Sequence, residues 1–268
     1  MGDEQTMDTI TSASNKKIKD ISALLRKASL RRERGEFVIE GPKIFKEAPD
    51  DMIVQIFAGE AFFRNAPAEV REKITSHESY IAADDVLAKA GDTMTTQGIM
   101  AVVRMQSDEE SLSRISQADA YVLLERLQDP GNLGTIIRSA EAAGFAVIMD
   151  QETTDIYSPK VVRSTMGTIF RVPHHRTDDL LGTIESLKSR GVRVYAAHLK
   201  GQRAYDAEDY TGASALLIGN ESAGLSDRIA EMADTYVRIP MLGKVESLNA
   251  AVAASVLMFE AARQRRNG

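Results

Sequence analysis

Apolar positions follow two different patterns along the chain. In residues 15–34 the apolar side chains of Ile18, Ile21, Leu24 and Leu25 recur at helical spacing, which predicts an amphipathic helix. Short apolar runs and helical stretches then alternate up to residue 104, as is typical of a small α/β domain. The predicted strands are Phe37–Glu40, Met52–Ala58, Ser79–Ala82 and Ile99–Val103, and the predicted helices are Pro42–Ala48, Pro67–Lys73 and Asp84–Ala90.

A continuous apolar run, Ala120–Leu124, opens a second pattern that is typical of parallel strands covered on both faces. The further predicted strands are Phe145–Met149, Ile169–Val172, Val192–Ala197, Ala215–Ile218 and Thr235–Ile239, and the predicted helices are Leu133–Ala143, Ser158–Gly167, Asp178–Arg190 and Ala250–Arg263. The stretch between the two patterns is rich in Ser, Asp, Glu and Gln. We therefore expect an N-terminal domain over 1–104 after a loose tail, a linker over 105–117, and a parallel-sheet α/β domain over 118–268.

Composition narrows the class of protein. The 268 residues are 43% hydrophobic and 27% charged, which fits a folded soluble chain. Because no signal peptide and no run of eighteen apolar residues is present, we expect a cytoplasmic protein without a membrane partner. Cysteine is absent and the four histidines lack metal-ligand spacing, so we expect no metal. Gly2 with Thr6 fits a loose myristoylation pattern, but no basic cluster follows closely as a second membrane signal.

Charge is distributed unevenly. The formal net charge is −6, yet residues 16–46 hold ten basic and four acidic residues. A net negative protein does not coat nucleic acid indiscriminately. The basic segment has two interpretations, a solvated helix surface or a local phosphate-binding face.

Three loops follow the carboxyl ends of predicted strands, where open α/β sheets bind ligands. They are Glu125–Asn132, Gly219–Ser226 and Arg238–Asn249. None has the spacing of a dinucleotide fingerprint or a P-loop, which disfavours those modes of nucleotide binding. The third loop leads into the apolar helix, and its Ser247 or Asn249 is also a candidate N-cap.

Together these loops resemble motifs 1, 2 and 3 of the SpoU (TrmH-like) branch of the SPOUT RNA methyltransferases, in the order and at the distances usual for that family. The matching stretches are Asn132–Arg138, Gly219–Gly224 and Ile239–Asn249. The resemblance covers residues 120–263. The N-terminal part is similar to the L30e-type substrate-binding domain of ribosomal RNA methyltransferases, on the basis of residues 34–41, Gln97–Gly98 and the overall layout.

The resemblance implies an S-adenosylmethionine-dependent 2′-O-ribose methyltransferase with a deep trefoil knot and a homodimer that builds the active site. It implies that main-chain groups of Gly219, Ile239 and Leu248 hold the adenine of the cofactor. The site residues carried over are Asn132, Arg138, Glu221, Ser247 and Asn249. Their roles keep alternatives, since Asn132 either contacts the ribose or Arg138 or only caps a helix, and Glu221 either orders its loop or supports the substrate site.

Arg138 is a poor base because its guanidinium stays protonated. We expect it to stabilise the developing alkoxide or to hold the neighbouring phosphate. Ser247 and Asn249 are expected both to cap the last helix and to position substrate.

RNA of the 23S ribosomal type is the expected partner. The basic side chains expected to contact its phosphates are Lys16, Lys17, Arg31, Arg32, Arg34 and Lys43. The alternatives are a transfer RNA methyltransferase, a non-catalytic RNA-binding protein with the same fold, and a nucleotide-dependent oxidoreductase. The sequence specifies neither the target nucleotide, nor a housekeeping or antibiotic-resistance role, nor the proton acceptor.

Overall fold

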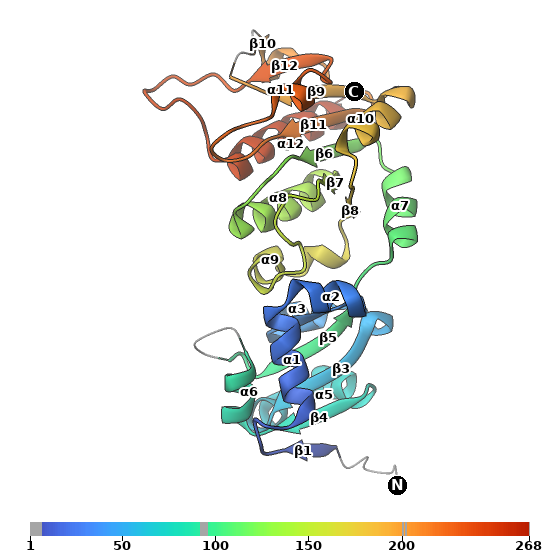
Figure 1. The fold of residues 1–268 in the computed structure, drawn as a ribbon, viewed down its shortest axis with the longest axis vertical. Coiled ribbons are helices and arrows are strands. Elements are labelled where there is room, and N and C mark those ends of the chain that lie inside the picture. Colours follow the sequence, from blue (N-terminus) through green and yellow to red (C-terminus); the bar gives the residue numbers. More distant parts are fainter. Residues whose placement is uncertain (1–6, 92–95, 200, 202, 268) are drawn as a thin grey trace. The chain divides into compact units, whose positions relative to one another are not determined.

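The computed structural model describes residues 7–91, 96–199, 201 and 203–267, which form two compact units (Figure 1). The first unit contains the residues up to Ser107 together with Tyr157–Phe170, and the second contains Asp108–Ile156 and the chain from Arg171 onward. The Gly2 pattern lies outside the described residues, as do positions 93–95 of the polar loop before the predicted strand Ile99–Val103.

The first unit is built on a five-stranded mixed sheet with the strand order β1-β4-β3-β5-β2. Its strands are β1 (Asp8–Ile10), β2 (Glu36–Glu40), β3 (Ile53–Gly59), β4 (Ser79–Ala82) and β5 (Ile99–Arg104). Its helices are α1 (Lys16–Arg26), α2 (Ala28–Arg34), α3 (Pro42–Glu47), η1 (Asp50–Met52), α4 (Glu60–Asn65), α5 (Ala68–Thr75) and α6 (Asp84–Ala90). β5 is antiparallel to both of its neighbours, while the other pairs are parallel.

The amphipathic helix predicted over 15–34 is two helices. Asn15 caps α1 by accepting a hydrogen bond from the Lys17 N–H at 2.9 Å, and Lys27 is extended (φ −114°, ψ 105°), which separates α1 from α2. Arg31 is only 4% exposed, and its Nη1 donates to the carbonyl of Leu24 at 2.6 Å. The last carbonyls of a helix need donors from outside it, so the Arg31 guanidinium stabilises this junction. The expectation that the Arg31 guanidinium contacts an RNA phosphate is therefore corrected, because this side chain is buried at the end of α1.

Residues 157–170 pack with the first unit although they lie between two strands of the second in sequence. They form α9 (Pro159–Thr165) and the short helix η2 (Thr168–Phe170). The ring of Phe37 on β2 lies 4.8 Å from that of Tyr157 and 6.2 Å from that of Phe170, between centroids. The strand predicted at Ile169–Val172 was therefore wrong.

The second unit is built on a seven-stranded, wholly parallel sheet with the order β10-β12-β9-β11-β6-β7-β8. Its strands are β6 (Ala120–Leu124), β7 (Ala146–Met149), β8 (His174–Arg176), β9 (Arg193–Ala197), β10 (Arg203–Ala204), β11 (Ser214–Ile218) and β12 (Thr235–Arg238). Its helices are α7 (Asp108–Ser116), α8 (Pro130–Ala143), α10 (Leu180–Ser189), η3 (Tyr205–Ala207), α11 (Asp227–Ala230) and α12 (Ala250–Asn267). The predicted α/β fold with a parallel sheet is confirmed.

Every residue of the central strands β6 and β11 is buried, as expected of parallel strands covered on both faces. The segment expected as a linker, 105–117, contains α7, which packs against the edge strand β8. Ser111 on α7 donates a hydrogen bond to the main-chain carbonyl of His174. Within the described ranges, no helix combines the length and apolar character that membrane crossing requires.

Candidate active site

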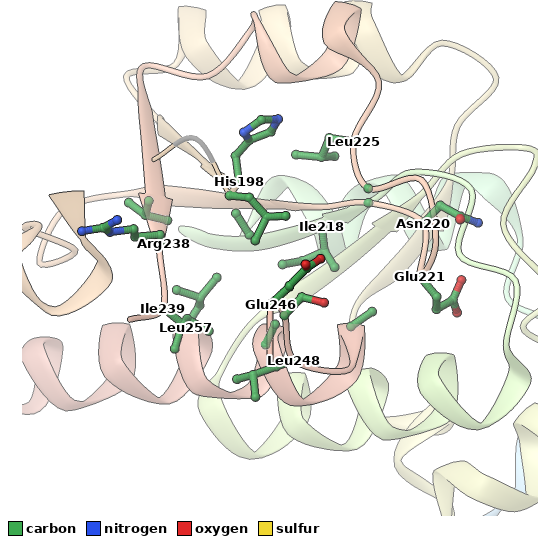
Figure 2. A pocket seen from close by; sticks show the side chains of 18 of the residues that line it. His198, Ile218, Asn220, Glu221, Leu225, Arg238, Ile239, Glu246, Leu248 and Leu257 are labelled. Carbon is green, nitrogen blue, oxygen red and sulfur yellow. The ribbon is translucent and has the colours of Figure 1, made fainter. Parts of the chain in front are cut away.

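A cavity of about 540 Å³ opens where three neighbouring strands, β9, β11 and β12, reach their carboxyl ends (Figure 2). Its walls come from the residues that follow these strands and from the first turns of α12. Apolar side chains such as Ile218, Leu225 and Leu257 line much of it. A site of this shape suits a ligand with a flat apolar part.

The loop after β11 turns back on itself at the cavity. Asn220 and Gly224 exchange two main-chain hydrogen bonds, of 3.1 and 2.9 Å, and Asn220 Oδ1 accepts from the N–H of Ser222 at 2.9 Å. A Cβ on Gly219 would lie 2.2 Å from the carbonyl carbon of Gly224 and 2.2 Å from the nitrogen of Leu225. Because those atoms belong to the main chain, only glycine fits at position 219.

All three residues expected to hold the adenine, Gly219, Ile239 and Leu248, line this cavity. In the part of the chain that the structure describes, their N–H and C=O groups form no hydrogen bond to other main-chain groups. Apolar walls with available main-chain donors and acceptors match the chemistry of an adenine ring. The residues present therefore fit S-adenosylmethionine.

A chain of side-chain hydrogen bonds joins the three motif loops beside the cavity. Asn249 Nδ2 donates to Asn132 Oδ1 at 2.9 Å, and Asn132 Nδ2 donates to Glu221 Oε1 at 3.0 Å. Asn249 Oδ1 also accepts from the N–H of Ala251 at 2.9 Å, so this residue caps α12 as well. Residues more than a hundred positions apart in sequence are held together in this way.

Glu221 is the acceptor at the end of that chain. Its carboxylate also accepts from the main-chain N–H groups of Gln128 at 3.1 Å and Asp129 at 2.9 Å. Burial acts to raise the pKa of Glu221, but the hydrogen bonds from Asn132, Asp129 and Gln128 outweigh it and leave the pKa below its usual value. The carboxylate is thus ionised at neutral pH and fixes the loop before α8.

The helix α8 begins earlier than predicted, and its N-cap is Asp129. Asp129 Oδ1 accepts from the N–H of Asn132 at 2.8 Å. The alternative that Asn132 only caps this helix is wrong, because Asn132 lies inside the first turn and its side chain points to Glu221 and Asn249.

Arg138 and Ser247 are not joined to this chain of hydrogen bonds. Ser247 lines the cavity and is exposed. Arg138 lies further along α8, exposed and outside the cavity lining, and its guanidinium contacts no hydrogen-bonding partner among the described residues. Its helix packs against α12, where Ser139 Oγ and Ser255 Oγ are 2.8 Å apart.

Sequence reasoning missed three residues of this region. His198 and Glu246 line the cavity, the first immediately after β9 and the second immediately before Ser247. Glu125, 7% exposed, accepts hydrogen bonds from the main-chain N–H of Ser226 at 2.7 Å and from its hydroxyl at 2.6 Å, which ties the loop after β6 to the loop after β11. A position directly after a parallel strand was the available signal for His198 and Glu125.

Of the other basic residues expected to contact RNA, two have an acidic side chain beside them and the remaining three are exposed. Lys17 pairs with Glu78 at 3.2 Å, and the Nη2 of Arg34 is 3.7 Å from Asp20. Lys16, Arg32 and Lys43 are exposed. No cluster of three or more His, Asp or Glu side chains in the described ranges is arranged to hold a metal ion.

Two family models match this chain. Residues 119–259 match the SpoU rRNA Methylase family, and residues 15–101 match the MRM3-like substrate binding domain.

Curated relatives align over nearly the whole chain. The 23S rRNA (guanosine(2553)-2′-O)-methyltransferase RlmP of Bacillus subtilis is 33% identical, over 94% of this chain and 98% of the relative. The 23S rRNA (uridine(2479)-2′-O)-methyltransferase of Streptomyces viridochromogenes is 31% identical, over 95% and 92%.

Solved structures agree with these matches. The SpoU methyltransferase AviRb of Streptomyces viridochromogenes in complex with AdoMet superposes with a TM-score of 0.84 at 33% identity, over 95% of this chain and 99% of that one. An AdoMet-bound rRNA methyltransferase from Sinorhizobium meliloti gives the same TM-score of 0.84 at 33% identity, over 96% and 98%.

The chain belongs to the SpoU rRNA methylase family. The predictions of an S-adenosylmethionine-dependent RNA methyltransferase and of an N-terminal substrate-binding domain are confirmed.

Proposed function

We propose that this protein transfers a methyl group from S-adenosylmethionine to a ribose 2′-hydroxyl of 23S ribosomal RNA. The observation that carries the proposal is the hydrogen-bonded chain Asn249–Asn132–Glu221, which meets, at Glu221, a cavity whose walls fit an adenosine. Both named relatives methylate ribose hydroxyls of 23S RNA, one at a guanosine and one at a uridine. Their different bases mean that the nucleotide has to be mapped for this chain.

When bound, the cofactor supplies an electrophilic methyl group on a sulfonium, which a ribose oxygen attacks in line. The task of the protein is therefore to hold the hydroxyl in that line and to assist loss of its proton. Asn132 and Asn249 hold the three loops together beside the cavity, and Ser247, which lines it, supplies a hydroxyl for contact with the nucleotide. Arg138 stays protonated and stabilises the developing alkoxide or the adjoining phosphate.

Two domains share the work in this proposal. Residues 1–104 bind the RNA, with the exposed Lys16, Arg32 and Lys43 contacting phosphates, and residues 118–268 carry the reaction. Phosphate contacts give affinity that falls with salt and carry no sequence information. The specificity then comes from presentation of one ribose of a folded or looped RNA.

We also propose a cytoplasmic homodimer whose C-terminal segment forms a trefoil knot, as the resemblance implies. The exposed side chains of Val252 (47%) and Phe259 (49%) give α12 an apolar face for a second copy. Arg138 is exposed, so it is available to complete a site that includes the partner.

The experiment is methyl transfer followed by mapping. The purified protein is incubated with methyl-labelled S-adenosylmethionine and either unmodified ribosomal RNA or unmodified transfer RNA. The methylated ribose is then located by the resistance of its phosphodiester bond to alkaline cleavage. Label in one 23S ribose supports the proposal. Label in transfer RNA alone, or cofactor binding with no transfer to either RNA, would contradict it.

Arg138 provides a mutational test. We expect Arg138→Ala to lower single-turnover methyl transfer about 10²-fold, because one donor to a developing negative charge is lost, while Arg138→Lys keeps the charge and loses less. Binding of S-adenosylmethionine, followed by calorimetry, should be unchanged in both variants, since Arg138 does not line the cavity. Substantial turnover by the Ala variant would exclude both proposed roles.

A further inference from the structure

Glu246 places a carboxylate in the cavity, and none of the described residues is its partner. It precedes Ser247 in the loop before α12 and lines the cavity, and Figure 2 shows its carboxylate directed into it. The side chain is exposed, and no hydrogen bond or ion pair connects it to any described residue. The charge is therefore available to a ligand.

The other polar and charged side chains that line the cavity do not neutralise the Glu246 carboxylate. Glu221 is occupied by Asn132 and by the two N–H groups before α8. The guanidinium of Arg238 points away from Glu246 in Figure 2. The ring of His198 stacks on Tyr236, with 5.1 Å between centroids. Of the described lining residues, Glu246 is thus the carboxylate left to interact with bound charge.

We infer that Glu246 recognises the positive sulfonium of the cofactor and so makes the site selective for S-adenosylmethionine over its product. This inference rests on the proposed use of S-adenosylmethionine in this cavity. In the reaction the carbon–sulfur bond to the methyl group breaks and a carbon–oxygen bond to the ribose forms. The electron pair of the broken bond stays on sulfur, and the hydroxyl proton leaves to solvent. The product S-adenosylhomocysteine therefore has a neutral sulfur, and the attraction to Glu246 is lost when transfer is complete.

A preference for S-adenosylmethionine over S-adenosylhomocysteine favours turnover, because the product is exchanged for new cofactor. The adenine and ribose are common to cofactor and product, so the main-chain contacts of Gly219, Ile239 and Leu248 hold both equally. A nearby carboxylate distinguishes them by charge alone. Glu246 acts as a specificity-determining residue that weakens product binding relative to cofactor binding.

The test is isothermal calorimetry on the full chain with three ligands: S-adenosylmethionine, S-adenosylhomocysteine, and sinefungin, which carries an ammonium-bearing carbon in place of the sulfonium. We expect Glu246→Gln to weaken binding of the two cationic ligands about two- to fivefold, as for an exposed ion pair, and to leave binding of S-adenosylhomocysteine unchanged. Glu246→Asp should retain part of the selectivity. Glu231→Gln, an exposed glutamate outside the cavity lining, is the matched control and should change nothing.

Each other outcome is decisive. Equal weakening of all three ligands would mean that Glu246 contacts a part common to cofactor and product, and the inference would be overturned. Unchanged binding of all three would overturn it too, because the carboxylate would then not face the cofactor. Failure of the unaltered protein to bind S-adenosylmethionine would instead overturn the proposed function itself, together with this inference. Circular dichroism melts of each variant test whether the fold is retained.

Discussion

Asn132 uses both ends of its amide. The oxygen accepts from Asn249 and the nitrogen donates to Glu221, so the residue requires an acceptor on one side and a donor on the other. An aspartate at this position would place a second carboxylate against Glu221, and an alanine would leave both partners without it. An amide side chain therefore suits this position, because it both donates and accepts a hydrogen bond.

We expect Asn132→Ala to reduce methyl transfer about 10²-fold, because the loops that carry Glu221 and Asn249 lose their fixed geometry, at a cost of about 1 kcal/mol in stability. The measurements are single-turnover kinetics and chemical denaturation. Thr135→Ala is the matched control, since Thr135 is exposed on the same helix and its hydroxyl bonds, among the described residues, only to the carbonyl of Gly131. A loss of stability of several kcal/mol in Asn132→Ala would indicate a purely structural role.

Motif order was enough to select Asn132, Glu221 and Asn249, but the sequence contained no information on the bonds between them, which join residues 89 and 117 positions apart. Arg31 illustrates the opposite case. A count of basic residues measures charge and not burial, so it could not distinguish this helix-end donor from the exposed Arg32.

At the scale of elements, the loop after β11 is shaped by close contact of main chain with main chain at Gly219. We expect Gly219→Ala to displace this loop and weaken binding of S-adenosylmethionine at least tenfold, with a loss of about 1–3 kcal/mol in stability from overpacking. Calorimetry and thermal melts measure the two effects.

Gly212→Ala is the matched control, because a Cβ there meets nothing within 4 Å. Unimpaired cofactor binding in Gly219→Ala would show that the loop does not need the close main-chain contact at position 219 to bind the cofactor.

Elements with strong patterns were predictable and short ones were not. Buried strands such as β6 and β11 were evident as apolar runs bounded by polar loops. β8 is a three-residue edge strand of His and Arg, so its sequence has no apolar signal, whereas the apolar stretch just before it folds as η2. Apolar runs of this length do not distinguish strand from helix by periodicity.

At the scale of the whole molecule, one face of α12 bears on assembly. The apolar side chains of Val252 and Phe259 are about half exposed on α12, the helix behind the cavity. Exposed apolar side chains on one element are typical of an interface that a partner covers.

We expect Phe259→Asp to convert the proposed dimer into a monomer, because a charge would be buried in the apolar contact. Light scattering after size exclusion gives the mass, and methyl transfer should fall with it if the partner completes the site. Leu112→Asp on α7, 51% exposed, is the control. A monomeric unaltered protein would contradict the proposed assembly.

A single break in the chain cannot separate the two units, because residues 157–170 belong to the first unit. This segment leaves the second unit after β7, packs on Phe37 of the first, and returns to form β8. Removal of everything before residue 105 would expose the apolar side of α9 and leave Phe170 without its neighbour. Exchange of the first unit between relatives therefore needs three junctions, one near residue 107 and one at each end of residues 157–170, so that this unit has to be engineered as two separate pieces of chain.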